Sequence, residues 1–200
     1  MRRLVSLFAL GLVTTSPALG IDEQSQAVID RLKTGKMVHI ADVGVLMMGA
    51  EKWCYAEDDG NCSWSDIYLE VTADGARYEI SNAWNENINI ASTDQGEFRN
   101  DRYICETDYD WVATVHATSR TDGSVISGRA LDGLRQEIRA GITNGRDDCF
   151  DYIFRGSDAA AETVTLLQRQ YAGGEYLPAN DVEVTLHFNA EDAAALGWYW

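Results

Sequence analysis

Apolar positions along this chain change their spacing several times, and each spacing predicts a type of secondary structure. Residues 22–34 predict a first helix, because Asp22 is a suitable N-cap and Gly35 a suitable C-cap around a narrow apolar stripe. Residues 129–142 predict an internal helix. Its apolar positions at helical spacing are Leu131, Leu134, Ile138 and Ile142. The tail that begins at Asn189 predicts two further helical turns.

Elsewhere apolar and polar residues alternate, which is typical of half-buried β-strands. The alternating runs lie at residues 65–71, 76–81, 87–92, 109–119, 149–155, 163–171 and 181–189, and the short segment EKW at residues 51–53 can form a further strand. Short connections with turn signals separate them. About eight such strands predict a mainly β (α+β) chain, built as an antiparallel sheet or a partly closed barrel with an N-terminal helix and one internal helix.

The segment SDIYLEVTADGARYEIS predicts a β-hairpin with a two-residue turn at Asp74 and Gly75. This turn pairs Leu69 with Ile80. It places one apolar set on a single face: Ile67, Leu69, Val71, Tyr78 and Ile80. The same register sets Glu70 opposite Glu79 on the other face, which is an unfavourable pair of like charges.

The first twenty residues have the pattern of a secretory signal peptide. Arg2 and Arg3 precede an apolar stretch at residues 4–13 that is too short to span a bilayer, and small residues suited to cleavage after Gly20 follow. A buried N-terminal helix is the alternative, but the stretch has no amphipathic period. We therefore expect residues 1–20 to be a cleaved signal and residues 21–200 to form a single β-rich globular domain, periplasmic or secreted.

The acidic composition narrows the classes of partner. Cleavage would remove two Arg and no acids, and would leave 14 basic side chains against 32 acidic ones, a net charge of −18. Nucleic acids and anionic membranes bind through Lys and Arg, so neither is an expected partner. Metal ions, polyamines and basic proteins fit the charge, although an acidic solvated surface explains it equally simply.

Four cysteines in an exported chain predict two disulfides, with three pairings open. Cys54 with Cys62, and therefore Cys105 with Cys149, is the preferred set, because a short hairpin brings the first two together. The bracketed stretch CYAEDDGNC does not fit an EF-type calcium loop, since Tyr55 would occupy its first ligand position. Asp59 and Gly60 instead favour a hairpin tip pinned by the disulfide.

Candidate catalytic chemistry is sparse. No nucleophile motif is present, no metal site or cofactor is indicated by the spacing of ligands, and no catalytic residue is assigned. Asp147, Asp148 and Asp151 offer a weak calcium site, for which a solvated acidic loop is the simpler interpretation. His116 and His187 lie on the polar sides of alternating strands and are candidates either for ordinary surface histidines or for a His/carboxylate site.

Aromatic residues are more informative, because Trp53 and Trp64 flank the predicted hairpin tip and can line a ligand pocket. The candidate binding residues are thus Trp53, Trp64, His116 and His187. The leading hypothesis is a non-catalytic binding module for a small apolar or sugar ligand or for a cationic protein. A hydrolase with a His/carboxylate site is the first alternative. A small outer-membrane β-barrel is the second, and the helix at residues 129–142 argues against it.

Overall fold

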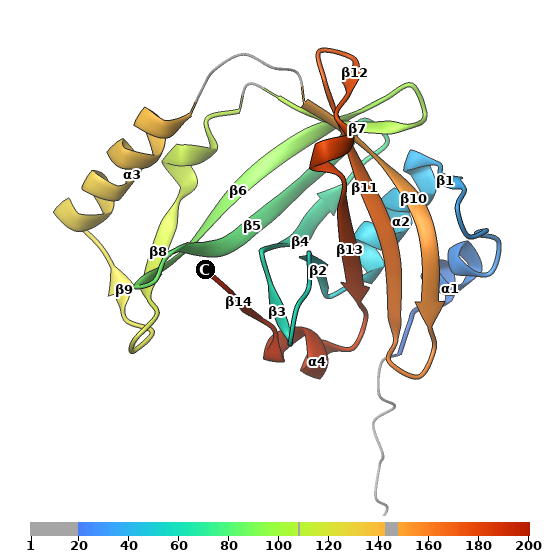
Figure 1. Cartoon of the computed structure of the whole chain (residues 1–200), viewed down its shortest axis with the longest axis horizontal. Helices are drawn as coiled ribbons and strands as arrows, with labels where there is room; N and C mark the ends of the chain where they lie inside the picture. The colour runs from blue at the N-terminus through green and yellow to red at the C-terminus, as the bar shows by residue number, and fades with distance from the viewer. Residues whose placement is uncertain (1–19, 108, 143–147) are drawn as a thin grey trace, which may run out of the picture.

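The computed structural model describes residues 20–107, 109–142 and 148–200, and its chain is mostly β with four α-helices (Figure 1). The predicted signal peptide lies outside the described residues, apart from Gly20. No described helix combines the length and the apolar character that crossing a membrane would need.

Eight antiparallel strands form a ring (Figure 1). In order around the ring they are β10 (Asp148–Asp158), β11 (Thr163–Ala172), β13 (Val182–His187), β2 (Lys52–Tyr55), β4 (Trp64–Val71), β5 (Gly75–Asn85), β6 (Ile88–Arg99) and β7 (Tyr103–Glu106). The short β7 closes the ring because it pairs with β6 on one side and with β10 on the other. The predicted partly closed barrel is therefore confirmed.

Further short elements extend the ring. β1 (Met37–Val38) pairs with β10, while β8 (His116–Ser119) and β9 (Val125–Ile126) continue the sheet beyond β6. β12 (Glu175–Tyr176) folds back on β11, and β3 (Asn61–Cys62) pairs in parallel with β14 (Gly197–Trp198). Two 3₁₀ turns occupy Trp111–Thr114 and Pro178–Asn180. The predicted strand at residues 109–119 is thus wrong in its first half, where one turn replaces it.

The helices agree in part with the sequence pattern. α1 (Glu23–Ile29) begins at the Asp22 cap, whose carboxylate accepts hydrogen bonds from two backbone amides, but it ends earlier than predicted. α3 (Arg129–Gly141) and α4 (Ala190–Ala195) confirm the internal helix and the helical tail. α2 (Ile40–Gly49) was not predicted, because its residues are apolar on nearly every side and conceal the helical period.

The core has two parts. In the main part, Val43, Leu46 and Met47 of α2 are fully buried in one apolar cluster with inward side chains of the ring. The smaller part joins α3 to the β6 and β8 end of the sheet, through Leu134 and Ile138 (Figure 1). Both α3 positions belong to the predicted apolar stripe, so helical spacing identified the packed face correctly.

The hairpin of β4 and β5 corrects the predicted register. A bulge at Leu69 and a longer turn pair Tyr68 with Tyr78 and Glu70 with Arg77. The Glu70 carboxylate lies 3.7 Å from the Arg77 guanidinium, so an ion pair replaces the predicted Glu–Glu repulsion. Ile67 and Leu69 are consequently exposed, and the inward positions of β4 include Tyr68 and Asp66. The predicted apolar face is wrong for Ile67 and Leu69.

Both preferred disulfides are present, Cys54–Cys62 and Cys105–Cys149. The second links directly paired residues of β7 and β10 on the outer face, so it staples the ring at the point where it closes. Two disulfides are typical of proteins that fold in an oxidising compartment outside the cytoplasm.

Candidate functional site

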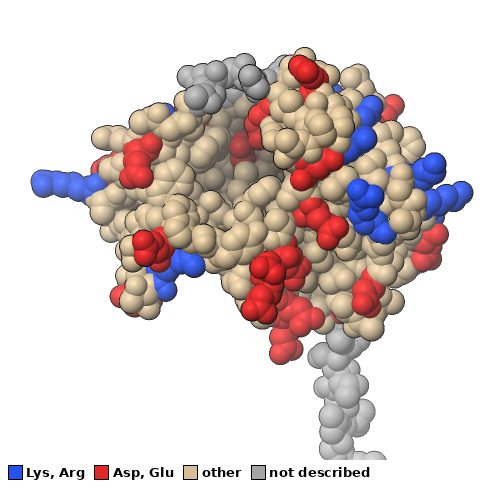
Figure 2. All heavy atoms as spheres, in the orientation of Figure 1, with Lys and Arg blue, Asp and Glu red and all other residues tan. Residues whose placement is uncertain are grey.

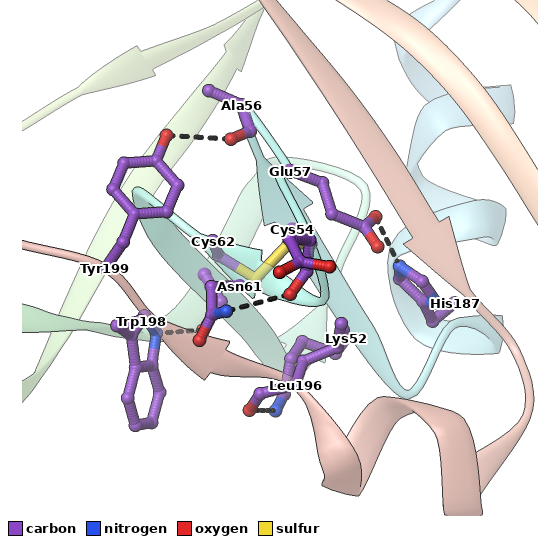
Figure 3. Close-up of a disulfide and its surroundings, with 12 residues drawn as sticks. Lys52, Cys54, Ala56, Glu57, Asn61, Cys62, His187, Leu196, Trp198 and Tyr199 are labelled. Atoms are coloured by element: carbon purple, nitrogen blue, oxygen red, sulfur yellow. Dashed lines mark hydrogen bonds and ion pairs between the residues drawn. A yellow bond between two sulfur atoms is a disulfide. The ribbon is translucent and has the colours of Figure 1, made fainter.

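The stapled tip, residues 54–62, is the hairpin that the sequence predicts (Figure 3). Asp58 and Asn61 pair across a turn, and Asp58 and Asp59 are exposed, whereas the Glu57 side chain turns towards β13. The C-terminal segment holds this tip, since the Tyr199 hydroxyl donates to the Ala56 carbonyl at 2.7 Å and β14 pairs with β3. These contacts give Trp198 and Tyr199 a structural role, whereas Trp200 is largely exposed.

His187 lies beside the stapled tip and makes a contact of 2.9 Å with the Glu57 carboxylate (Figure 3). With Cys54 these residues form the one group of described His, Cys, Asp and Glu side chains close enough to share a metal ion. Metal binding by cysteine needs a thiolate, and Cys54 is in a disulfide. The group therefore amounts to a His–carboxylate pair on the outer face of β13.

His116 belongs to a different part of the surface. It is exposed on β8, where its ring nitrogen lies 3.9 Å from the Glu79 carboxylate. Four strands separate β8 from β13 in the sheet, so His116 and His187 do not converge on one cleft. The geometric condition that a hydrolase using both histidines would require is absent from the described residues.

The two candidate tryptophans have different environments. Trp53 is fully buried, with edge-on ring contacts to Tyr68 and Tyr152 at 5.2 and 5.6 Å. Trp64 is only partly buried and stacks on Tyr55, with ring centroids 4.7 Å apart. Trp64 is therefore available at the edge of the ring interior, whereas Trp53 is a core residue.

Four carboxylates face the interior of the ring, and we call Asp66, Asp94, Glu106 and Asp148 the interior acids. Strand register assigns them this face. Asp66 pairs with the inward Trp53, and Asp94 pairs with the inward Tyr78. Glu106 and Asp148 each lie two residues from a core side chain of their own strand, Ile104 and Phe150. Ring closure thus gathers acids from β4, β6, β7 and β10.

Asp66 and Asp94 are buried, Glu106 and Asp148 are partly buried, and none of the four has a matching positive charge among the described residues. Asp66 and Asp94 are 5% and 7% exposed. The Tyr55 hydroxyl donates to Asp66 Oδ2 at 2.8 Å, and the backbone amide of Gln95 donates to Asp94 Oδ1 at 2.7 Å. Asp66 Oδ1 and Asp148 Oδ1 are buried and have no hydrogen-bond partner among the described residues. None of the four acids forms an ion pair with a described basic side chain.

Burial has a clear electrostatic consequence. It raises the pKa of Asp66 to about 7, although the Tyr55 hydrogen bond opposes the shift and the charge of Asp94 adds to it. Burial also raises the pKa of Asp94 to about 6. The pKa of Glu106 rises to about 7 through burial and through the charges of Asp148 and Asp94. Such shifts concentrate at functional sites, since unpaired buried carboxylates are otherwise costly.

Figure 2 shows the surface hollowed between the α3 side of the molecule and the ring, with acidic side chains inside the hollow. Asp94 lies on the inward face of β6, where it pairs with the core residue Tyr78. Carboxylates beside tyrosine and tryptophan rings attract cations by charge and by the electron-rich ring faces. The site is therefore suited to a positively charged ligand.

A second concavity lies between the helices and the ring. This groove has a volume of about 560 Å³ and an apolar floor that includes Gly44, Met48 and Phe98. Two acids line this groove, Asp22 and Asp101, and Asp22 is already engaged as the cap of α1. The groove has the size of a ligand site but few polar groups that converge on its centre.

Comparison with known proteins finds no matching family, no matching curated protein and no matching solved structure. The interior acids must therefore be interpreted from their own geometry. The sequence did not reveal these acids as a group. Glu106 lies in the segment ETDYD and Asp148 in RDDCFD, and neither can be told from a surface acid until the strand register is known.

The acids of the segment at residues 147–151 do not share one environment in the folded chain. Asp148 faces the interior, whereas Asp151 is fully buried among ionic partners and forms ion pairs with Arg102 and Arg169. Asp147 lies outside the described residues. The preferred interpretation of this segment, a solvated acidic loop, is therefore wrong for Asp151. The alternative of a weak calcium site is not supported either, because two guanidinium groups already neutralise Asp151.

Proposed function

We propose that this chain is a non-catalytic binding module that holds a small organic cation against the interior acids of the ring. The observation that carries the proposal is the burial of Asp66 and Asp94, without an ion pair, on the inward face of the ring that Glu106 shares. A folded protein that ionises these groups without a counter-charge loses stability. A bound cation supplies the missing charge.

The recessed position of the acids favours a small ligand over a basic protein. Asp66 and Asp94 are more than nine-tenths buried, so the flat surface of a folded partner would not reach them. The partly exposed Trp64, which stacks on the buried Tyr55, offers an aromatic surface for the apolar part of the ligand. We place this activity in the periplasm or outside the cell, which the two disulfides favour.

Calorimetric titration of the mature, oxidised chain tests the proposal with two probes of the same shape, n-butylamine and 1-butanol. At pH 8 and low salt the amine binds and the alcohol does not, because only the amine carries a charge. Asp94→Asn weakens amine binding about tenfold or more, which is the loss of one charge-assisted hydrogen bond. The control Asp192→Asn makes the same chemical change at an exposed position and leaves the affinity unchanged.

Equal binding of the alcohol and the amine would overturn the proposal, because the site would then recognise shape rather than charge. Loss of amine binding in Asp192→Asn to the same extent as in Asp94→Asn would also overturn it, since the effect would come from the net charge of the protein.

A further inference from the structure

The interior acids form a chain across the ring rather than a compact cluster. Asp66 lies on β4 and Asp148 on β10, and three strands separate these two in either direction around the ring. Asp66 and Asp148 therefore start from opposite walls. Asp94 and Glu106 lie between them, and the charge of each acid influences the next, from Asp66 to Asp94, to Glu106 and to Asp148.

The spacing of this chain does not suit a single metal ion. A bound Ca²⁺ or Zn²⁺ draws its ligand atoms into one coordination sphere. Among the described side chains, the only group of three or more potential ligand atoms within 4.8 Å of one another is the one at Cys54, Glu57 and His187. The interior acids are thus spread too widely to surround one ion, and a ligand that neutralises several of them must carry several separated charges.

The two ends of the chain each have a free acceptor. Asp66 is only 5% exposed and its side chain faces the interior of the ring. Its Oδ1 atom has no hydrogen-bond partner among the described residues. Asp148 Oδ1, at the other end, is also buried and lacks a partner in the described part of the chain. Each oxygen requires a donor, and an ammonium group supplies three N–H donors together with the opposite charge.

The stretch between these ends is partly apolar. The ring of Tyr78 lies on the inward face beside Asp94, and Tyr68 pairs with Tyr78 across the two strands. Aromatic rings pack well against methylene groups, and their faces also attract cations. The chain of interior acids therefore has a carboxylate at each end and, between them, aromatic rings against which an aliphatic chain can pack.

We infer that the ligand is a linear aliphatic diamine or polyamine, which lies along the chain of interior acids with one ammonium group towards Asp66 and another towards Asp148. This inference rests on the proposed function, and it specifies the number and separation of charges that the site recognises.

The test compares putrescine with n-butylamine by calorimetric titration of the mature, oxidised chain at pH 8 and low salt. The two probes share a four-carbon chain and differ by one ammonium group. We expect putrescine to bind at least about tenfold more tightly, because it makes a second charge-assisted contact. In Asp148→Asn the putrescine advantage falls to about the twofold statistical factor of its two equivalent ends, while Asp192→Asn, exposed on α4, retains the full advantage.

Each outcome bears on a different statement. Equal affinities of putrescine and n-butylamine for the wild-type chain would overturn the diamine inference and leave the proposed function standing. Absence of binding by both amines would overturn both. An advantage of putrescine that persists undiminished in Asp148→Asn would overturn the assigned end point. The comparison of putrescine with n-butylamine on the wild-type chain shows whether the site recognises one ammonium group or two, even if Asp148→Asn does not fold.

Discussion

Replacement of Asp66 by Asn isolates the electrostatic cost of the interior acids. The two side chains have nearly the same shape, and the Tyr55 hydroxyl that now donates to Asp66 Oδ2 at 2.8 Å can donate equally to the amide oxygen. The substitution therefore removes a buried ionisable group while it keeps the local packing. What changes is the dependence of folding stability on pH.

The sign follows from the direction of the pKa shift. Asp66 ionises near pH 3.8 in an unfolded chain and at about pH 7 in the native protein. Between these values the native state holds the proton and the unfolded state does not, so stability falls as pH rises. Because Asp66 is only 5% exposed, solvent screening is small. The shift corresponds to roughly 4 kcal/mol in total, of which about 3 kcal/mol is lost between pH 5 and pH 8.

Urea denaturation at pH 5, 6, 7 and 8, without added amine, measures the effect. The free energy of unfolding of the wild-type chain should decline by about 3 kcal/mol more than that of Asp66→Asn over this range. For the exposed control Asp192→Asn, the free energy of unfolding should change with pH by the same amount as in the wild type. If the free energy of unfolding had the same pH dependence in the wild type and in Asp66→Asn, the reasoning would be refuted. Asp66 would then have the same pKa in the folded and the unfolded chain. The comparison of slopes is independent of any fixed cost of burying the Asn amide.

Two further predictions concern the groups around the site and the ring closure. Tyr55→Phe removes the hydroxyl that donates to Asp66, so the native protein should lose about 1–2 kcal/mol at pH 8 and less at pH 5, where Asp66 is protonated. Urea denaturation at both pH values checks this. Replacement of Cys105 and Cys149 by Ser opens a staple with a sequence separation of 44 residues, against 8 for the stapled tip. In the chain-entropy model it should cost about 1–2 kcal/mol more than removal of the tip disulfide, and equal losses in urea denaturation would contradict this entropic account.

Much of the fold follows from local patterns in the sequence. Alternation predicted most of the long strands, Asn189 and the spacing of Leu134 and Ile138 predicted two helices, and the short separation of Cys54 and Cys62 predicted the pairing of all four cysteines. These features depend on residues that are near neighbours in the chain or on the same face of one element. They are therefore visible without knowledge of the tertiary structure.

The parts that failed depend on contacts between elements. The bulge at Leu69 shifts the register of the hairpin, and its benefit, the pairing of Glu70 with Arg77, appears only when both strands are aligned. α2 is buried on most sides, so its sequence has no polar face to reveal a helical period.

The interior acids illustrate the same limit for the site. Glu106 and Asp148 are far apart in sequence and meet because β7 pairs with β10, a contact that no local pattern encodes. Their alternation with apolar residues is the same as that of outward-facing acids. Only the closed ring shows which side of each strand is buried.

The central claim is that a cation binds to ionised interior acids, and the protons exchanged on binding test it most directly. Titration of the mature chain with the tightest-binding amine, near pH 6.5 in two buffers of different ionisation enthalpy, gives this number. The amine is already fully charged at that pH, whereas Asp66 and Glu106 are largely protonated with pKa values of about 7. The account predicts that binding releases protons, so the apparent enthalpies differ between the buffers. Binding with no proton release, or with proton uptake, would contradict it.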